Sequence, residues 1–402
     1  MSKIMKIHFF INLKLMMVFL SVPVWAQNYE AYYNYIGNYP HNREITMSEQ
    51  IQGVTHDDKN WFFTQRETIW KIPVDLSLNT DRTCSDSRID CTFISDVPEL
   101  SGYNHFGDPS YYWYIDEGYL FVPTEYKNNS KMDVIAVFAA SDLSFIDMVE
   151  VHAAQENHAS WCSIIPDIPG LNNRNTVYLY STKWENVGSL VKYKVNMSAL
   201  RNKGNGKLDM EFVEKIPLND EAGEPYGLDY VQGGVFTLSG ELLYLINGNC
   251  QDDCDCGIHV FKNEGESFRI VNRSSQSDHP FKFEYHPRPS CHEEPEGVTI
   301  WDLDDDKAPY IKGQLHVILL VDDYFDQDQW YFKHYSGTIY VDGVSGGSHG
   351  TFDEPFNTLN EAINYAWDGS KIKIKGGSYP EAVTFSKQVE VSAYDGNVVV
   401  GH

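Results

Sequence analysis

The sequence lacks any apolar run of the roughly 20 residues that a membrane-spanning helix needs, and it is poor in basic side chains. It has 31 Lys and Arg against 57 Asp and Glu, so the formal net charge is −26 at pH 7. A surface of this sign repels nucleic acid and anionic membranes, and it favours solubility, cations and neutral ligands. We therefore expect no membrane span and no nucleic-acid partner.

Cysteine is scarce, with 7 residues, and the paired C-x-x-C motifs of a structural zinc site are missing. Cys84 and Cys91 bracket a polar loop that a disulfide can close. The cluster at 250–256 either holds an internal bridge or pairs with Cys291, with zinc as the alternative. Because the number of cysteines is odd, at least one thiol stays unpaired or pairs with another molecule.

Acidic residues are absent from the first residues, which carry Lys3, Lys6 and Lys14. An apolar run then extends from Leu15 and ends in Val24-Trp25-Ala26. This is the pattern of a signal peptide over 1–26. The sequence therefore predicts a secreted or extracytoplasmic protein, which permits disulfides.

Long amphipathic helices are missing before residue 337. Short aromatic and β-branched runs alternate there with Gly, Asn and Asp turns, as in half-buried antiparallel strands. The runs form five units, each opening with a polar residue next to a small one. The openings are Gln52-Gly53, His105-Phe106-Gly107, His158-Ala159-Ser160, Gln232-Gly233 and Glu296-Gly297.

The openings follow one another at steps of 53, 53, 74 and 64 residues. Such a period suits four strands with variable loops and indicates a β-propeller. The first strand of each blade lines the central channel, where small residues let backbones approach. We predict an all-β protein with a five-bladed propeller over 27–336, six blades being the alternative. The tyrosine-rich stretch 28–48 supplies the outer strand of the last blade and closes the ring.

The most specific segment is Glu294-Pro295-Glu296-Gly297-Val298-Thr299-Ile300-Trp301-Asp302. It resembles exported bacterial β-propellers, and the resemblance covers about 45–335. Five-bladed glycosidases and six-bladed esterases or lyases share this architecture. Their catalytic signatures are not matched residue by residue, so the resemblance implies a fold and no activity.

The pattern of apolar and polar residues changes over 337–402. Apolar residues at helical spacing predict one amphipathic helix, and Lys371 to Pro380 reads as an alternating strand and turn. The helical positions are Phe356, Leu359, Ile363 and Ala366. The segment 338–400 resembles the N-terminal cap and first coil of pectin-lyase-like right-handed parallel β-helices. Such solenoids bury their core by stacking several coils, so we expect either a longer natural chain or one coil packed on the propeller.

Polar residues from the five openings are predicted to converge at the channel mouth. They are Gln52, His105, His158, Gln232 and Glu296. Two histidines and a carboxylate could bind a ligand, hold a cation or perform acid–base chemistry. The alternative is that these residues hydrogen-bond one another and channel water.

Further carboxylates flank the second and fifth openings, and glycoside hydrolysis uses such pairs. They are Asp108, Asp116, Glu117, Glu293 and Glu294. Another acidic group suits an oxygen-ligated calcium ion or a solvated hairpin turn. It comprises Asp322, Asp323, Asp326 and Asp328, and the turn at 302–306 has the same two interpretations. No other cofactor is expected.

Two functions remain open from the sequence, and whether the protein is an enzyme stays undecided. The first is an exported propeller that binds extracellular glycan or a cell-surface partner through its channel mouth. The alternative is a secreted polysaccharide-cleaving enzyme, a glycoside hydrolase or lyase, that uses the carboxylates and histidines of the mouth.

The signal-peptide prediction is testable on secreted material. Because the apolar run ends in Val24-Trp25-Ala26, cleavage after this small-residue site should leave Gln27 as the first residue. Mass spectrometry of the secreted protein measures this terminus directly. Recovery of the chain with Met1 intact would show that the prediction is wrong.

Overall fold

The fold is described from a computed structural model. It describes residues 33–41, 43–127, 131–156, 158–166, 175–201, 206–248, 256–274, 281–285, 292–304, 307–322, 328–345, 347, 350, 352, 355–366, 370–385 and 389–401. The expected signal peptide over 1–26 lies outside these ranges. So do Cys250, Cys254, Cys291, Asp323 and Asp326.

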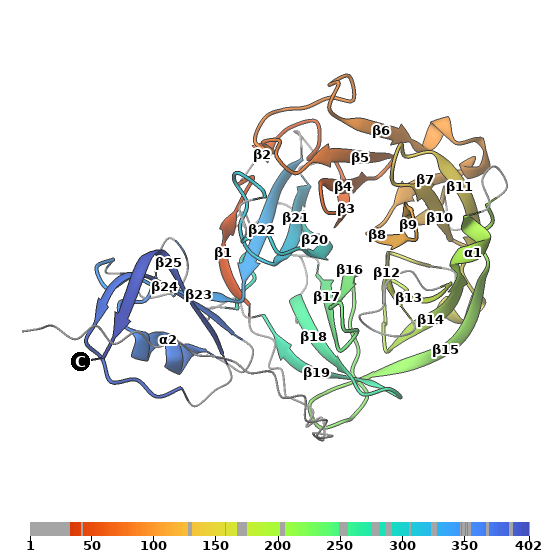
Figure 1. The fold of residues 1–402 in the computed structure, drawn as a ribbon. Helices are drawn as coiled ribbons and strands as arrows, with labels where there is room; N and C mark the ends of the chain where they lie inside the picture. The colour runs from red at the N-terminus through yellow and green to blue at the C-terminus, as the bar shows by residue number, and fades with distance from the viewer. Residues whose placement is uncertain are drawn as a thin grey trace, which may run out of the picture.

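Four sheets surround a central axis and form the five blades of a propeller, because a short parallel pairing joins blades III and IV into one eight-stranded sheet (Figure 1). Blade I contains β3 (Ile51–His56), β4 (Asn60–Gln65), β5 (Thr68–Pro73) and β6 (Asp90–Phe93). Blade II contains β7 (Tyr103–Phe106), β8 (Ser110–Tyr114), β9 (Glu117–Tyr126), β10 (Val134–Ala139) and β11 (Phe145–Glu150). Blade III contains β12 (Trp161–Pro166), β13 (Thr176–Thr182), β14 (Ser189–Asn196) and β15 (Met210–Asn219).

Blade IV contains β16 (Val231–Phe236), β17 (Leu242–Asn247), β18 (Gly257–Asn263) and β19 (Phe268–Arg273). Blade V contains β20 (His292–Ile300), β21 (Leu315–Asp322) and β22 (Gln329–Ser336), with β1 (Asn34–Asn38) and β2 (Arg43–Glu44) on its outer edge. A short helix, α1 (Met197–Leu200), follows β14. The five-bladed prediction is therefore confirmed.

The N-terminal segment closes the ring. Strand β1 pairs antiparallel with β22, with Asn34 opposite Ser336. Asp328 strengthens this closure, because its carboxylate accepts the amide of Gln50 at 2.8 Å and its carbonyl accepts the hydroxyl of Ser48 at 2.5 Å. The predicted outer strand of the last blade is thus present, and an open sheet edge is avoided.

The core lies between neighbouring blades. Because each sheet is covered on both faces, its middle strands are apolar almost throughout, and every residue of β10 is buried. Between blades I and V, aromatic rings pack edge to face, with the centroids of Trp61 and Phe332 5.3 Å apart. The sequence predicted half-buried strands, whereas these middle strands are buried on both faces.

The inner strands β3, β8, β12, β16 and β20 face the axis in Figure 1, and small residues let them approach one another. A Cβ atom on Gly297 would lie 2.5 Å from the Cα of Gly53, and one on Gly53 would lie 2.5 Å from the Cα of Asp108. On Gly107 it would lie 2.1 Å from the carbonyl oxygen of Ser160. The expected role of the small residues is therefore confirmed.

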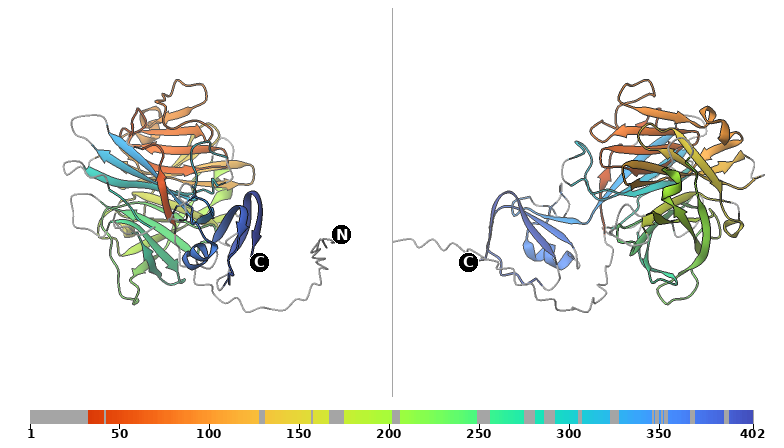
Figure 2. Two further views of the ribbon diagram at one scale, coloured as in Figure 1. Left: turned by 90° about the vertical axis from the view of Figure 1, so that its left-hand side faces the viewer. Right: turned by 45° about the vertical axis from the view of Figure 1, so that its right-hand side comes forward.

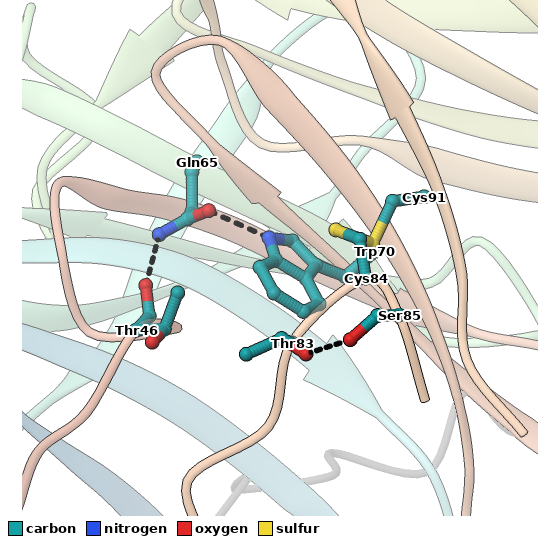
Figure 3. Close-up of a disulfide and its surroundings, with 7 residues drawn as sticks. All are labelled: Thr46, Gln65, Trp70, Thr83, Cys84, Ser85 and Cys91. Carbon is teal, nitrogen blue, oxygen red and sulfur yellow. Dashed lines mark hydrogen bonds between the residues drawn. A yellow bond between two sulfur atoms is a disulfide. The ribbon is translucent and has the colours of Figure 1, made fainter. Parts of the chain in front are cut away.

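The loop between β5 and β6 is closed by the predicted disulfide between Cys84 and Cys91, whose Cα atoms are 5.6 Å apart (Figure 3). Trp70 lies beside this bridge, and its indole donates to Gln65 at 2.6 Å. Cys256 is also disulfide-bonded. Cys162 is a buried free thiol. It is therefore an unpaired cysteine of the kind that an odd number of cysteines requires.

The C-terminal segment forms a separate body beside the propeller (Figure 2). Strands β23 (Thr338–Val341), β24 (Lys371–Tyr379) and β25 (Glu390–Val400) pair in parallel, with the helix α2 (Leu359–Tyr365) between the first two in sequence. The predicted strand and helix are therefore present.

The start of this helix differs from the prediction. A capping box between Thr358 and Glu361 begins the helix at Leu359. Phe356 lies before it and bridges Val341 instead. The helical spacing of Phe356 was therefore fortuitous. In the ranges that the structure describes, no helix is long and apolar enough to cross a membrane.

Gly297→Val should destabilise the fold. The added side chain would meet the backbone of Gly53 and Val54, which cannot rotate away as a side chain can, so we expect a loss of about 1–3 kcal/mol in the free energy of unfolding. Urea denaturation measures the loss. Gly188→Val is the control, because nothing lies within 4 Å of a Cβ at Gly188. Equal stability of the two variants would contradict the packing described here.

Candidate functional site

A buried carboxylate lies at the axis of the propeller. Asp108 follows β7 and accepts backbone amides from three other blades, those of Val54 at 2.9 Å, Gly234 at 3.2 Å and Val298 at 3.3 Å. Its own backbone pairs with blade III, since its amide donates to Ser160 at 2.9 Å. Burial raises the pKa of this carboxyl well above its ordinary value. Asp108 therefore joins the inner ends of all five blades.

Above this residue the channel mouth opens into a cavity of about 690 Å³. All five residues predicted to converge there do line it. They are Gln52, His105, His158, Gln232 and Glu296. The geometric prediction is correct, because the starts of five inner strands meet at one end of the channel. A ligand-binding or catalytic role for them remains a prediction.

Two of the five residues contact each other across blades I and II. The imidazole of His105 places Nε2 2.6 Å from Oε1 of Gln52 and Nδ1 3.2 Å from Oε2 of Glu125. The hydrogen bond from His105 holds the pKa of Glu125 below its ordinary value. Glu125 is therefore an ionised carboxylate at the cavity wall.

A second histidine pairs with a buried carboxylate. Nδ1 of His158 lies 3.5 Å from Oδ2 of Asp133, and the His158 side chain is 37% exposed whereas that of Asp133 is 3% exposed. Asp133 also accepts the amides of Ala159 at 2.9 Å and Tyr126 at 3.1 Å. Burial is the largest effect on Asp133 and raises its pKa to about 6.

Two glutamates of β20, Glu294 and Glu296, line the cavity. Glu296 is 1% exposed and hydrogen-bonds to Glu294, and Gln232 Nε2 lies 3.5 Å from Glu296 Oε1. Burial, followed by repulsion from Glu294, raises the pKa of Glu296 well above its ordinary value. The raised pKa favours the neutral form of the Glu296 carboxyl.

The loop between β13 and β14 forms the rim. Trp184 is 39% exposed and packs edge-on against Tyr230, with ring centroids 5.1 Å apart. The carbonyl of Trp184 accepts the amide of Val231 at 3.0 Å, which anchors the loop to blade IV. Beside it, Nζ of Lys183 lies 2.7 Å from Oε2 of Glu156. These contacts thus hold the Trp184 indole where it lines the cavity.

The other flanking carboxylates do not share this cavity. Asp116 and Glu117 lie in the turn between β8 and β9, at the far end of the inner strand, and line a separate hollow of about 360 Å³ beside Trp113. Asp116 pairs there with Arg201 at 2.8 Å. Asp116 and Glu117, which were considered among the flanking carboxylates, therefore do not line the channel-mouth cavity.

The acidic hairpin between β21 and β22 is described only in part. Asp322 ends β21, and Asp328 hydrogen-bonds to the N-terminal segment, as described above for the ring closure. Among the described residues, no three His, Cys, Asp or Glu side chains are grouped as metal ligands. The calcium site remains a prediction.

Several residues of the cavity were not predicted, among them Glu125, Asp133 and Trp184. Glu125 lies near the end of β9 and Asp133 just before β10, so their hairpin returns to the mouth beside His105 and His158. Glu125 and Asp133 could have been predicted from one signal. They are charged residues at the end of the second strand of a blade and at the beginning of the third. Trp184 lies on a loop whose position depends on the fold.

No family model matches the sequence, and no curated protein matches it. Among solved structures, the GH43_1 enzyme from Xanthomonas citri complexed with xylose aligns at a TM-score of 0.42 and 8% identity, over 72% of this chain and 89% of that one. Cellvibrio cellulosa α-L-arabinanase complexed with arabinohexaose aligns at 0.36 and 12%, over 73% and 91%. Myxococcus xanthus glutaminyl cyclase aligns at 0.37 and 8%, over 76% and 96%. Likeness this distant assigns no activity, and the propeller assignment rests on the sheet topology of this chain.

The buried carboxyl of Asp133 should make stability depend on pH. Its pKa is raised from 3.8 to about 6, so its proton stabilises the folded state fully below the lower value, and this stabilisation is lost as the pH rises through about 6. We expect the free energy of unfolding of the wild type, relative to Asp133→Asn, to fall by up to about 3 kcal/mol over this interval. Urea denaturation at a series of pH values tests this, and a constant difference would contradict it.

Proposed function

We propose that this is an exported protein that binds an extracellular glycan through its channel mouth. The observation that carries the proposal is the convergence of polar side chains from all five blades in one cavity with an exposed indole at its rim. Export is part of the proposal and is supported by the signal-peptide pattern over 1–26.

The chemistry of the cavity suits a ligand rich in hydroxyl groups. Its volume of about 690 Å³ falls in the usual range for small-molecule sites. Amides of Gln52 and Gln232 both donate and accept, and carboxylates accept only. A sugar hydroxyl also donates and accepts. The flat face of Trp184 can cover the apolar face of a sugar ring. One mono- or disaccharide unit of a longer chain can therefore be held.

Polysaccharide cleavage is the second candidate, and one observation favours it. Glu296 and Glu125 share the cavity, and their pKa values are displaced in opposite directions. A protonated and an ionised carboxyl in one site are what an acid and a base require. Glu294 cannot be the partner of Glu296, because hydrogen-bonded carboxyls are closer than the roughly 5 Å or more that glycosidases need.

The C-terminal segment belongs to the same proposal. We infer that residues 337–402 are the cap and first coil of a pectin-lyase-like parallel β-helix, attached to the propeller. The parallel pairing of β23, β24 and β25 supports this, since adjacent coils of such a solenoid pair in this way. Catalytic residues of such folds lie on later coils, so this segment carries no assigned role in binding. Neither function invokes a cofactor, and calcium at the acidic hairpin stays a prediction.

A polysaccharide panel separates the two candidates. The purified protein is incubated with each polysaccharide, and both retention on the polymer and new reducing ends or unsaturated products are measured. Retention without products supports binding, and products support cleavage. If no polysaccharide is retained or cleaved, both proposals are wrong.

Variants of the cavity sharpen this test. His105→Ala and His158→Ala should weaken retention at least about tenfold, because each removes a group that contacts or orients a cavity carboxylate. Glu296→Gln should keep retention, since an amide resembles a protonated carboxyl, but should abolish any cleavage. Glu211→Gln, an exposed change on β15, is the matched control. Loss of retention in the control alone would place the site elsewhere.

A further inference from the structure

Trp184 is the one large apolar side chain among the described residues that line the cavity, and it is 39% exposed. The other described lining residues are polar, charged or small. A sugar ring that stacks on a single indole depends on the direction in which that indole points. The contacts behind Trp184 therefore decide whether the indole is ready to receive a ring.

Two segments from blades III and IV form a short antiparallel ladder at the base of Trp184. Val187, in the loop between β13 and β14, and Leu228, before β16, exchange two backbone hydrogen bonds at 2.8 and 3.0 Å. Further along, the Trp184 carbonyl accepts the Val231 amide at 3.0 Å. Hydrogen bonds between the two blades thus fix the main chain of Trp184, but its side chain needs a separate support.

Tyr230 lies within this ladder in a strained backbone conformation. Its φ is +57°, in the left-handed region where a bulky side chain is an outlier. The ladder holds one side of the residue, and on the other side the Tyr230 carbonyl accepts the Gly248 amide at 3.0 Å. Strain of this kind persists only where the surroundings impose it, and it gathers at ligand sites. An aromatic ring is therefore held where glycine would meet no strain.

The ring of Tyr230 contacts the indole of Trp184. The two ring centroids lie 5.1 Å apart with an interplanar angle of 65°, which is close to the edge-to-face arrangement that aromatic pairs prefer. Whichever ring presents its edge, at least one face of the indole stays uncovered by this contact. Tyr230 is not among the described lining residues. It therefore acts on a ligand in the cavity only through Trp184.

We propose that Tyr230 is a positioning residue, which aims the Trp184 indole into the channel mouth as a preformed platform for the apolar face of a sugar ring. This inference rests on the proposed glycan binding and assigns one more residue to it. Ordering a side chain during binding costs free energy, and an indole that is held before binding avoids that loss. The left-handed backbone at 230 directs the tyrosine ring toward Trp184, which explains why a residue other than glycine stands there.

Variants at position 230 separate the ring from the backbone. Tyr230→Phe keeps the ring, whereas Tyr230→Gly and Tyr230→Asn remove it with residues that accept the left-handed backbone. Affinity electrophoresis in native gels that contain xylan, mixed-linkage β-glucan or galactan measures binding. With a polysaccharide that retards the wild type, we expect Tyr230→Gly, Tyr230→Asn and Trp184→Ala to bind at least about fivefold more weakly.

Two further variants are the controls. Tyr230→Phe should bind within about twofold of the wild type, because the ring that supports the indole is kept. Trp113→Ala should bind as the wild type, since Trp113 is also exposed but lines the separate hollow at the other end of the inner strand. Weaker binding by Trp113→Ala than by Trp184→Ala would overturn the inference.

Fluorine NMR of protein labelled with fluorotryptophan reports the position of the indole directly. The resonance that is missing from Trp184→Phe belongs to Trp184. Without polysaccharide, Tyr230→Gly and Tyr230→Asn should shift this resonance and leave that of Trp113 in place, whereas unfolding would move both. A Trp184 resonance that stays in place in both variants would contradict the proposal.

The outcomes also separate this inference from the proposed function. If Tyr230→Gly and Tyr230→Asn bind as the wild type while Trp184→Ala does not, the indole needs no support and only the inference is wrong. If Trp184→Ala also binds as the wild type, the glycan is held by other residues, and again only the inference is wrong. If no polysaccharide in the gels or in the panel binds the wild type, the proposed function falls, and the inference falls with it.

Discussion

The propeller depends on one contact, the insertion of the Asp108 carboxylate between the inner strands. The amides that it accepts, those of Val54, Gly234 and Val298, each follow a glycine that opens a blade. A glycine is needed there because a Cβ atom would prevent the backbones from approaching to hydrogen-bond distance. The Asp108 carboxylate can thus accept these amides only because the openings carry small residues.

The same contact explains how the channel mouth is built. In each opening, the polar residue precedes the small residue, so it lies one step closer to the channel mouth than the strand that Asp108 holds. Backbone hydrogen bonds fix the position of these strands. The side chains at the starts of the strands are therefore also held in fixed positions. The cavity is therefore assembled from the rigid part of the fold, and its rim is added by the hairpin and loops of blades II and III.

Much of this could be predicted from the sequence, because the relevant signals are local. The openings, in which a polar residue precedes a small one, and the apolar runs after them predicted the blades. The same openings predicted the convergence of residues such as His105 and Glu296. The tyrosine-rich N-terminal stretch predicted the ring closure. Asp108 was read as one of several acidic candidates, since its role exists only when five strands meet. The distance of Asp116 from the mouth could not be predicted, because sequence proximity to His105 does not reveal that the intervening inner strand separates them.

The position of Glu125 and Asp133 was hidden for a related reason. Each lies at the end of a strand, where a charged residue ordinarily marks a solvated turn. Only the pairing of β9 with β10 carries them back to the mouth. Glu294 and Glu296 were visible as a motif, but the raised pKa of Glu296 follows from its burial, which the sequence does not state.

The ring closure also orders the events of folding. Because Asn34 pairs with Ser336, blade V cannot be completed until nearly the whole propeller segment is available, whereas the strands within blades I to IV pair with near neighbours. Joining such distant partners carries a larger loop-closure entropy and is slow. The first strand therefore stays unpaired until the last blade is available, and the residues of the channel mouth are brought together only at that final step.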